Sequence, residues 1–152
     1  MQWRDVLAEW GVNKLQLKLG FLDMEFVPQD DDRNAAWELY VELATRISTQ
    51  PLPSGLGADA KALVSLYSLF QTTRDIMKRH GPGAIHFTRI GIAVLNRVLR
   101  PFLTRWHGVI NAENKPSSAT QDEFRKQLEL VRLDMLQYAR VLAKIADVEE
   151  LH

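Results

Sequence analysis

The chain has 152 residues, of which 46% are apolar and 25% are charged, a composition typical of globular proteins. This length suits a single domain, 1–152, that buries most of its apolar surface without needing a covalent cross-link such as a disulfide. Because the sequence contains no cysteine, it excludes disulfides, thiolate metal sites, iron–sulfur clusters and cysteine nucleophiles. The 19 basic and 19 acidic side chains cancel, so no overall basic excess indicates nucleic-acid binding.

The sequence shows no pattern typical of export or membrane insertion. The first eleven residues carry Arg4, Asp5 and Glu9, whereas a secretory signal peptide needs an uncharged apolar centre. The weakly charged apolar stretch 90–99 is shorter than the roughly 20 apolar residues that a bilayer span requires. We therefore expect a soluble, cytoplasmic protein that makes no membrane contact.

Residues 1–29 are predicted to form an N-terminal covering segment. Apolar residues between Trp3 and Trp10 recur at helical spacing and indicate a short helix. Between Leu15 and Phe26 the apolar residues alternate, which is the period of a strand. This stretch fits either a small hairpin or an extended segment packed on the rest of the chain.

Two long helices are predicted in the first half of the remaining chain. The first spans about 31–49, with its start capped by the run of aspartates at 30–32. The second begins near Asp59, a candidate cap, and ends at Gly81. Between these helices, proline and glycine in 50–57 indicate a loop.

A third helix is predicted over 84–109 and a fourth over 119–148. The third is apolar around much of its circumference and contains Pro101, where we expect a kink or break. In the fourth, Thr120 and Glu123 fit a capping box. An unbroken heptad seam follows, made of Phe124, Leu128, Val131, Met135, Tyr138, Leu142 and Ile145.

The fourth helix also has a second apolar stripe, which contains Leu130, Leu133 and Val141. This stripe needs a partner, either the N-terminal segment or a second chain. The predicted fold is therefore mainly α: a four-helix antiparallel bundle over 30–110 and 119–148, with a short N-terminal helix and a small extended or hairpin segment.

Although the net charge is zero, the charges are segregated along the chain. Residues 61–118 hold 9 basic and 2 acidic side chains, and the segments on both sides are acidic. One stripe of the third helix gathers its polar residues, namely Arg89, Asn96, Arg97, Arg100 and His107. This strip suits a phosphate, an RNA backbone or an acidic partner. Alternatively, it is a solvated face whose charge is matched by acids of the first helix such as Glu38 and Glu42.

Two arginine–histidine pairs are the strongest catalytic motif in the sequence. Five residues separate Arg74 from His80, and six separate Arg100 from His107. This spacing resembles the Arg-x4–6-His motif of the HEPN family, small helical bundles that often act as metal-independent ribonucleases. The resemblance implies that histidine and arginine meet at a dimer cleft, where histidine moves the 2′-hydroxyl proton and arginine stabilises the phosphorane.

Metal and cofactor sites are not predicted. Asp30, Asp32 and Asn34 have the spacing that opens a calcium loop, but the glycine and the final glutamate of that loop are absent. Helix capping accounts for these residues better. We therefore predict neither a metal nor a cofactor.

The favoured function is a non-catalytic interaction or adaptor module that binds a protein partner or forms a homodimer. Its polar contact surface would contain Arg89, Asn96, Arg97, Arg100 and His107, and its apolar one Leu130, Leu133 and Val141. One alternative is a HEPN-like ribonuclease or an inactive relative that uses Arg74 with His80 or Arg100 with His107. Another alternative is a regulatory bundle that binds a small anion or nucleotide on the basic strip.

Overall fold

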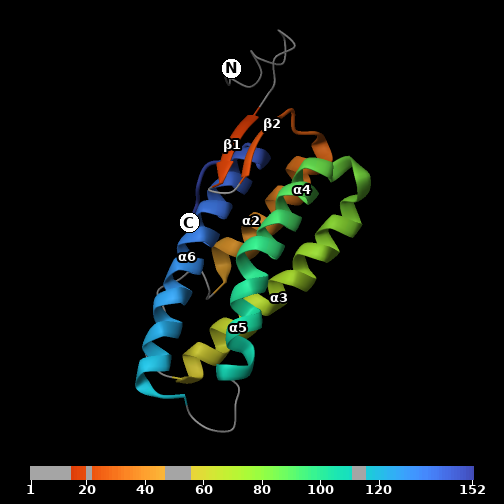
Figure 1. Cartoon of the computed structure of the whole chain (residues 1–152). Coiled ribbons are helices and arrows are strands. Elements are labelled where there is room, and N and C mark those ends of the chain that lie inside the picture. The colour runs from red at the N-terminus through yellow and green to blue at the C-terminus, as the bar shows by residue number, and fades with distance from the viewer. Residues whose placement is uncertain (1–14, 20–21, 47–55, 111–115) are drawn as a thin grey trace.

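The computed structural model describes residues 15–19, 22–46, 56–110 and 116–152, and these residues are mainly helical (Figure 1). The strands are β1 (Leu15–Leu19) and β2 (Leu22–Phe26), and the α-helices are α2 (Asp30–Thr45), α3 (Leu56–His80), α4 (Ile85–Val94), α5 (Arg100–Ile110) and α6 (Ser118–Ala146). The predicted N-terminal helix lies outside the described residues, as do most of the predicted loop after α2 and most of the linker before α6.

The start of α2 is fixed by the buried carboxylate of Asp32. The backbone N–H of Gln29 donates to Asp32 Oδ2 at 2.9 Å, which forms half of a capping box. The backbone N–H of Phe87, near the start of α4, donates to Asp32 Oδ1, also at 2.9 Å. Of the predicted run 30–32, Asp32 is confirmed as a capping residue, although it lies in the first turn and Gln29 is the N-cap. Each oxygen of Asp32 accepts a backbone N–H at the start of a helix.

The start of α3 differs from the prediction, whereas its end agrees with it. Because α3 begins at Leu56, Asp59 lies in its first turn and is not the cap. Asp59 is instead buried and pairs with Arg125 of α6, with Asp59 Oδ1 2.5 Å from Arg125 Nε. At the other end, Gly81 adopts a left-handed φ of 68°, which ends α3 and leads into a 3₁₀ turn.

The predicted third helix consists of α4, a π-helical turn at Leu95–Leu99, and α5. Pro101 has no N–H to donate to the carbonyl of Arg97, and its ring crowds that carbonyl in a regular α-helix. The N–H of Arg100 donates to the carbonyl of Leu95, five residues back. The predicted irregularity is confirmed, and it takes the form of a wider turn directly before the proline.

The start of α6 is capped by a different residue from the one predicted. Ser117 is the N-cap, and its Oγ accepts a hydrogen bond from the Thr120 N–H at 3.2 Å. The predicted capping box of Thr120 and Glu123 is therefore wrong, because the helix already includes Thr120. The predicted heptad seam is confirmed, since all seven of its side chains are buried.

The second apolar stripe of α6 is only partly exposed. Leu130 and Leu133 are 59% and 50% exposed, whereas Val141 is 6% exposed. The prediction that Val141 belongs to a contact surface is therefore wrong. Strand β1 packs on α6, and Figure 1 shows the strands beside the C-terminal part of that helix. Strand β1 thus lies along the C-terminal part of α6, whereas Leu130 and Leu133 are exposed.

The two strands pair antiparallel, from Leu15 opposite Phe26 to Leu19 opposite Leu22. The hairpin alternative is therefore the one that the structure adopts. Phe26 is buried and stacks on the ring of His86, with the ring centroids 4.6 Å apart. This contact holds β2 on α4.

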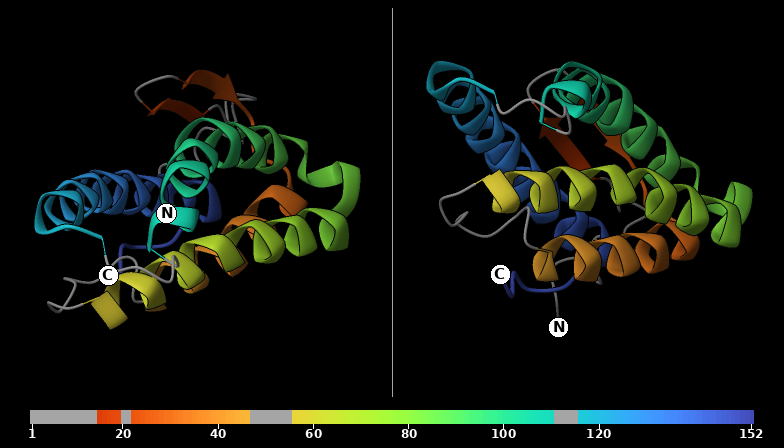
Figure 2. Two further views of the ribbon diagram at one scale, coloured as in Figure 1. Left: turned by 60° about the horizontal axis from the view of Figure 1, so that its bottom comes forward. Right: turned by 90° about the horizontal axis from the view of Figure 1, so that it is seen from below.

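The helices enclose one apolar core. Helix α2 packs against both α3 and α6, and α5 also packs against α3 and α6 (Figure 2). Where α5 meets α6, Phe124 packs between Phe102 and Trp106, and Trp106 Nε1 donates to Gln127 Oε1 at 3.0 Å. Within the described ranges, no helix combines the length and apolar character that crossing a membrane requires.

Candidate functional site

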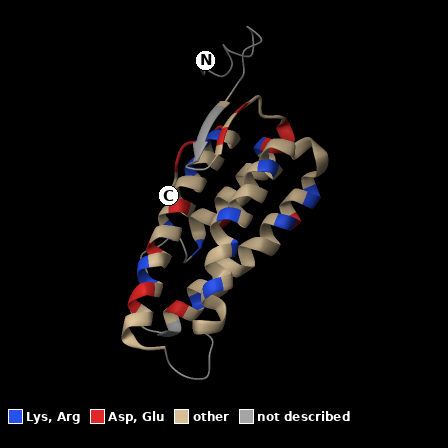
Figure 3. Cartoon of the chain, in the orientation of Figure 1, with Lys and Arg blue, Asp and Glu red and all other residues tan. Residues whose placement is uncertain are grey.

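Some of the basic residues are matched by acids of α2 (Figure 3). Glu38 Oε2 accepts a hydrogen bond from Arg79 Nη2 at 3.0 Å and lies 3.0 Å from His80 Nε2. Burial alone would raise the pKa of Glu38, but the hydrogen bonds from His80 and Arg79 outweigh burial and lower this pKa below its usual 4.5. The basic end of α3 is therefore matched by Glu38, whereas these contacts involve no residue of the strip on the third helix.

Two arginines nearby are not matched in this way. Within the part of the chain that the structure describes, neither Arg74 of α3 nor Arg100 of α5 forms a salt bridge. Arg100 Nε donates to Asn96 Oδ1 at 3.2 Å, a neutral partner one turn earlier. Among the described residues, no carboxylate therefore balances the charge of either guanidinium group.

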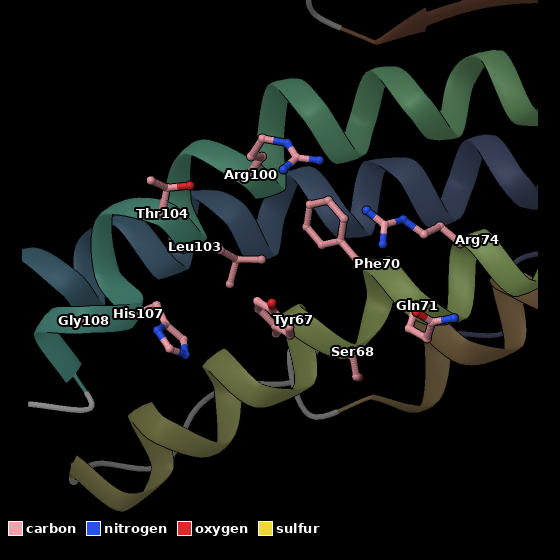
Figure 4. Close-up of a pocket in the computed structure, with 10 residues that line it drawn as sticks. All are labelled: Tyr67, Ser68, Phe70, Gln71, Arg74, Arg100, Leu103, Thr104, His107 and Gly108. Carbon is pink, nitrogen blue, oxygen red and sulfur yellow. The ribbon is translucent and has the colours of Figure 1, made fainter.

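These two arginines line a pocket of about 520 Å³ between α3 and α5 (Figure 4). Its volume is within the range of about 300–1,000 Å³ that is usual for small-molecule sites. The described lining contains no Asp or Glu; it consists of Tyr67, Ser68, Phe70, Gln71, Arg74, Arg100, Leu103, Thr104, His107 and Gly108.

At one end of the pocket, both arginines are held against the same aromatic ring. The guanidinium carbon of Arg74 lies 5.8 Å from the centroid of Phe70, and that of Arg100 lies 5.2 Å from it. Figure 4 shows both guanidinium groups beside the ring of Phe70, with Arg100 above the ring and Arg74 to its right. Cation–π attraction orients both groups, and an anion placed between them would offset their mutual repulsion. We call Phe70, Arg74 and Arg100 the cationic end.

The other end of the pocket is aromatic. Tyr67 is 61% exposed, and its ring centroid lies 6.0 Å from that of His107. Tyr67 and Arg74 are seven positions apart along α3, and Arg100 and His107 are seven positions apart along α5, so the two ends are about 10 Å apart. We call Tyr67 and His107 the aromatic end.

The polar wall on α3 is held in place by neighbouring side chains. Arg46 Nη1 donates to Ser68 Oγ at 2.5 Å. Gln71 Nε2 donates to Asp75 Oδ1 at 2.7 Å, which places that carboxylate beside the pocket lining and outside it. The wall is therefore polar and ordered without adding a negative charge to the pocket.

The structure separates one arginine–histidine pair and keeps the other together. Arg100 and His107 line the same pocket because they lie two turns apart on α5. Arg74 lines that pocket too, but His80 is bonded to Glu38 and is not among the lining residues. The described site therefore combines Arg74 with Arg100 and His107.

The other predicted contact residues lie outside this pocket. Arg89 is exposed on α4, and Arg97 is exposed on the π-helical turn. Asn96 contributes indirectly, by accepting the hydrogen bond from Arg100. Leu130 and Leu133 are exposed on α6.

Sequence reasoning missed Tyr67 and Phe70 as site residues. Both belong to the apolar side of the second helix, where such residues usually form core. One signal was present, since Arg74 follows Tyr67 by seven residues and shares its helix face. An arginine within an apolar stripe can indicate that this part of the stripe faces a polar cavity.

No three His, Asp or Glu side chains among the described residues are grouped so that they could hold a metal ion. No known protein family, curated protein or solved structure matches the chain.

Proposed function

We propose that this chain is a non-catalytic helical binding module that holds a phosphate-type anion in the pocket between α3 and α5. One observation carries the proposal: Arg74 and Arg100 converge on Phe70 in a pocket whose described lining has no carboxylate. Guanidinium groups bind phosphate through paired, charge-assisted hydrogen bonds. Two of them facing one cavity suit a single dianionic group.

The contrast with the other end of α3 supports a binding role. Arg79 and His80 are matched by Glu38, as is typical of a structural surface cluster. Arg74 and Arg100 have only Phe70 and Asn96 as described partners. This arrangement leaves their charge available to a ligand.

The scaffold in this proposal is an antiparallel four-helix bundle with the hairpin as its cover. Opposite directions of α3 and α5 account for the pocket, because they place Arg74 beside Arg100 and Tyr67 near His107. A cytoplasmic location stays a prediction.

Calorimetric titration of the full chain with inorganic phosphate tests the proposal, with sulfate as a second dianion. We expect saturable binding to the wild type and loss of binding in Arg74→Gln and Arg100→Gln. Arg89→Gln is the matched control, because it removes the same charge from an exposed position outside the pocket. Equal binding by all three variants, or no binding by the wild type, contradicts the proposal.

A second candidate function is a HEPN-like ribonuclease, which is favoured by the position of Arg100 and His107 in one pocket. In that function His107 would accept the 2′-hydroxyl proton and Arg100 would stabilise the phosphorane. Incubation with labelled RNA in the absence of metal tests it, and His107→Ala identifies the histidine. If wild-type protein leaves the RNA intact at every concentration, this candidate is excluded.

A protein partner or a second copy of the chain is also part of the proposal, at a different surface. On α6, Leu130 is 59% exposed and Leu133 is 50% exposed. The pocket lies elsewhere, between α3 and α5. Exposed leucines at this spacing support a helix-face contact. An anion in the pocket and a partner on α6 would then bind to separate faces.

A further inference from the structure

The two ends of the pocket call for different chemical groups in one ligand. The cationic end presents two guanidinium groups and suits a phosphate. The aromatic end presents the ring of Tyr67, which is 61% exposed although it is large and flat. An anion alone occupies only the cationic end and leaves this ring in water.

The Tyr67 ring is positioned to support a planar group. It is tilted by 38° against His107, with a centroid separation of 6.0 Å, which is too small for another ring to enter between them. A ligand ring can therefore lie only on the outward face of Tyr67. Stacking of a nucleobase on an exposed aromatic side chain contributes to binding and depends little on the identity of the base.

Between the two ends, the pocket offers neutral hydrogen-bonding groups. Thr104 lines it from α5, and Gln71 lines it from α3. Ser68 also lines it, but its hydroxyl already donates to the Ser65 carbonyl and accepts from Arg46. Thr104 and Gln71 are therefore the groups available to a ligand. Hydroxyl and amide side chains both donate and accept, which suits the hydroxyls of a sugar. Two helical turns, about 10 Å, separate the ends, so a spacer must join the ring to the phosphate.

We infer that the ligand joins a phosphate to a planar ring through a polar spacer, and that a nucleoside 5′-monophosphate has this chemistry. Its phosphate binds Arg74 and Arg100, and its base lies on Tyr67. This inference rests on the proposed function and adds the class of ligand to it.

The test compares adenosine 5′-monophosphate, ribose 5-phosphate and inorganic phosphate by calorimetric titration of the full chain at one ionic strength. We expect adenosine 5′-monophosphate to bind at least about tenfold more tightly than ribose 5-phosphate, because only the nucleotide carries a planar aromatic base. Tyr67→Ala should abolish this difference and leave the affinity for ribose 5-phosphate unchanged. Tyr67→Phe should preserve the difference, since the ring is retained.

Val64→Ala is the matched control, because Val64 is 66% exposed one turn before Tyr67 and does not line the pocket. It should bind all three compounds as the wild type does. If the nucleotide and ribose 5-phosphate bind wild type equally, or if Tyr67→Ala keeps the tenfold difference, the inference is overturned while phosphate binding stands. If no compound shows binding that depends on Arg74 and Arg100, both the inference and the proposed function fail.

Discussion

The carboxylate of Asp32 accepts the backbone N–H of Phe87 at 2.9 Å, across 55 residues of sequence. The same carboxylate accepts the N–H of Gln29 at 2.9 Å, so one fully buried side chain caps two helices. Each of these N–H groups lies at a helix start, where backbone donors have no partner within the helix. Asp32 therefore couples the start of α2 to the start of α4.

Replacing Asp32 should lower the free energy of unfolding by more than the loss of a single helix cap does. Asp32→Ala leaves two N–H groups without their acceptors, and we expect a loss of about 3 kcal/mol in the free energy of unfolding. Asp32→Asn keeps one acceptor oxygen and should lose about half as much. Urea unfolding of the three proteins measures these differences. A loss below about 1 kcal/mol for Asp32→Ala would show that water replaces the carboxylate.

The buried pair of Asp59 and Arg125 predicts a pH-dependent effect. Burial raises the pKa of Asp59 above its usual 3.8, and the charge and hydrogen bond of Arg125 only partly oppose this rise. The stability contributed by Asp59 is therefore fully present below its unfolded pKa and is lost as the pH rises through its folded pKa. Arg125→Met should cost about 3 kcal/mol at pH 7. The loss should be smaller near pH 4, because a larger fraction of Asp59 is then protonated and carries no charge.

The control for this prediction lies on the same helix. Arg132 forms an exposed pair with Glu129, so Arg132→Met should cost less than about 1 kcal/mol at either pH. Urea unfolding at pH 4 and pH 7 separates the two variants. A loss from Arg125→Met that is the same at both pH values would mean that Asp59 is not the group left unpaired.

Two buried tyrosines should respond in opposite directions to loss of the hydroxyl. Tyr138 Oη is buried with no hydrogen-bond partner among the described residues, and burial raises the pKa of Tyr138 above its usual value. Tyr138→Phe should leave the unfolding free energy unchanged or increase it by about 1 kcal/mol, because an unpaired buried hydroxyl is removed.

The matched control is Tyr40, which is equally buried but has partners. Its hydroxyl accepts the N–H of Leu151 at 2.6 Å and lies 2.9 Å from Nδ1 of His152. Tyr40→Phe should cost about 1 kcal/mol, since the Leu151 N–H loses its acceptor. Thermal unfolding of both variants tests the pair. A larger loss for Tyr138→Phe than for Tyr40→Phe would reveal a partner for Tyr138.

Helix positions were predictable where the local pattern itself determines them. The heptad seam of α6 is buried as predicted, because its period alone selects the face that meets the core. Gly81 ends α3 as predicted, because the left-handed φ needed there favours glycine. The caps were less predictable: Ser117 and Thr120 both suit a cap, and local sequence does not choose between them.

The candidate site depends on contacts between distant segments, and sequence spacing shows only one helix at a time. The sequence shows that Tyr67 and Arg74 share one helix face, and that Arg100 and His107 share another. It does not show that Arg74 lines the same pocket as Arg100, or that His80 pairs with Glu38 outside this pocket. Val141 was wrongly expected to be exposed for the same reason, since the packing of other segments on α6 buries it. Long-range packing decides which apolar stripe is core and which arginine is matched.

The exposed leucines of α6 predict self-association or contact with a protein partner. Replacing both Leu130 and Leu133 by Gln should change the unfolding free energy by less than about 0.5 kcal/mol, because both side chains are already largely in water. The same double variant should weaken any concentration-dependent dimer seen by light scattering. If the wild type stays monomeric at high concentration, this surface does not form a homodimer.

The charges of the cationic end should serve binding and contribute little to folding. Arg100 has Phe70 and Asn96 as described partners, and its charge is repelled by that of Arg74. Arg100→Gln loses a cation–π contact but relieves this repulsion, so without ligand the unfolding free energy should change by less than about 0.5 kcal/mol. The effect should appear only when an anion is added.

Phosphate at about 100 times its dissociation constant should stabilise the wild type by about 2.7 kcal/mol, because it binds only the folded chain. Thermal unfolding in phosphate and in chloride of equal ionic strength measures this gain. Arg100→Gln should lose the gain, whereas Arg89→Gln should keep it, since Arg89 lies outside the pocket. If Arg100→Gln is destabilised by more than about 2 kcal/mol in chloride, Arg100 is a structural residue, because a group that mainly serves a ligand should not be needed to fold the chain.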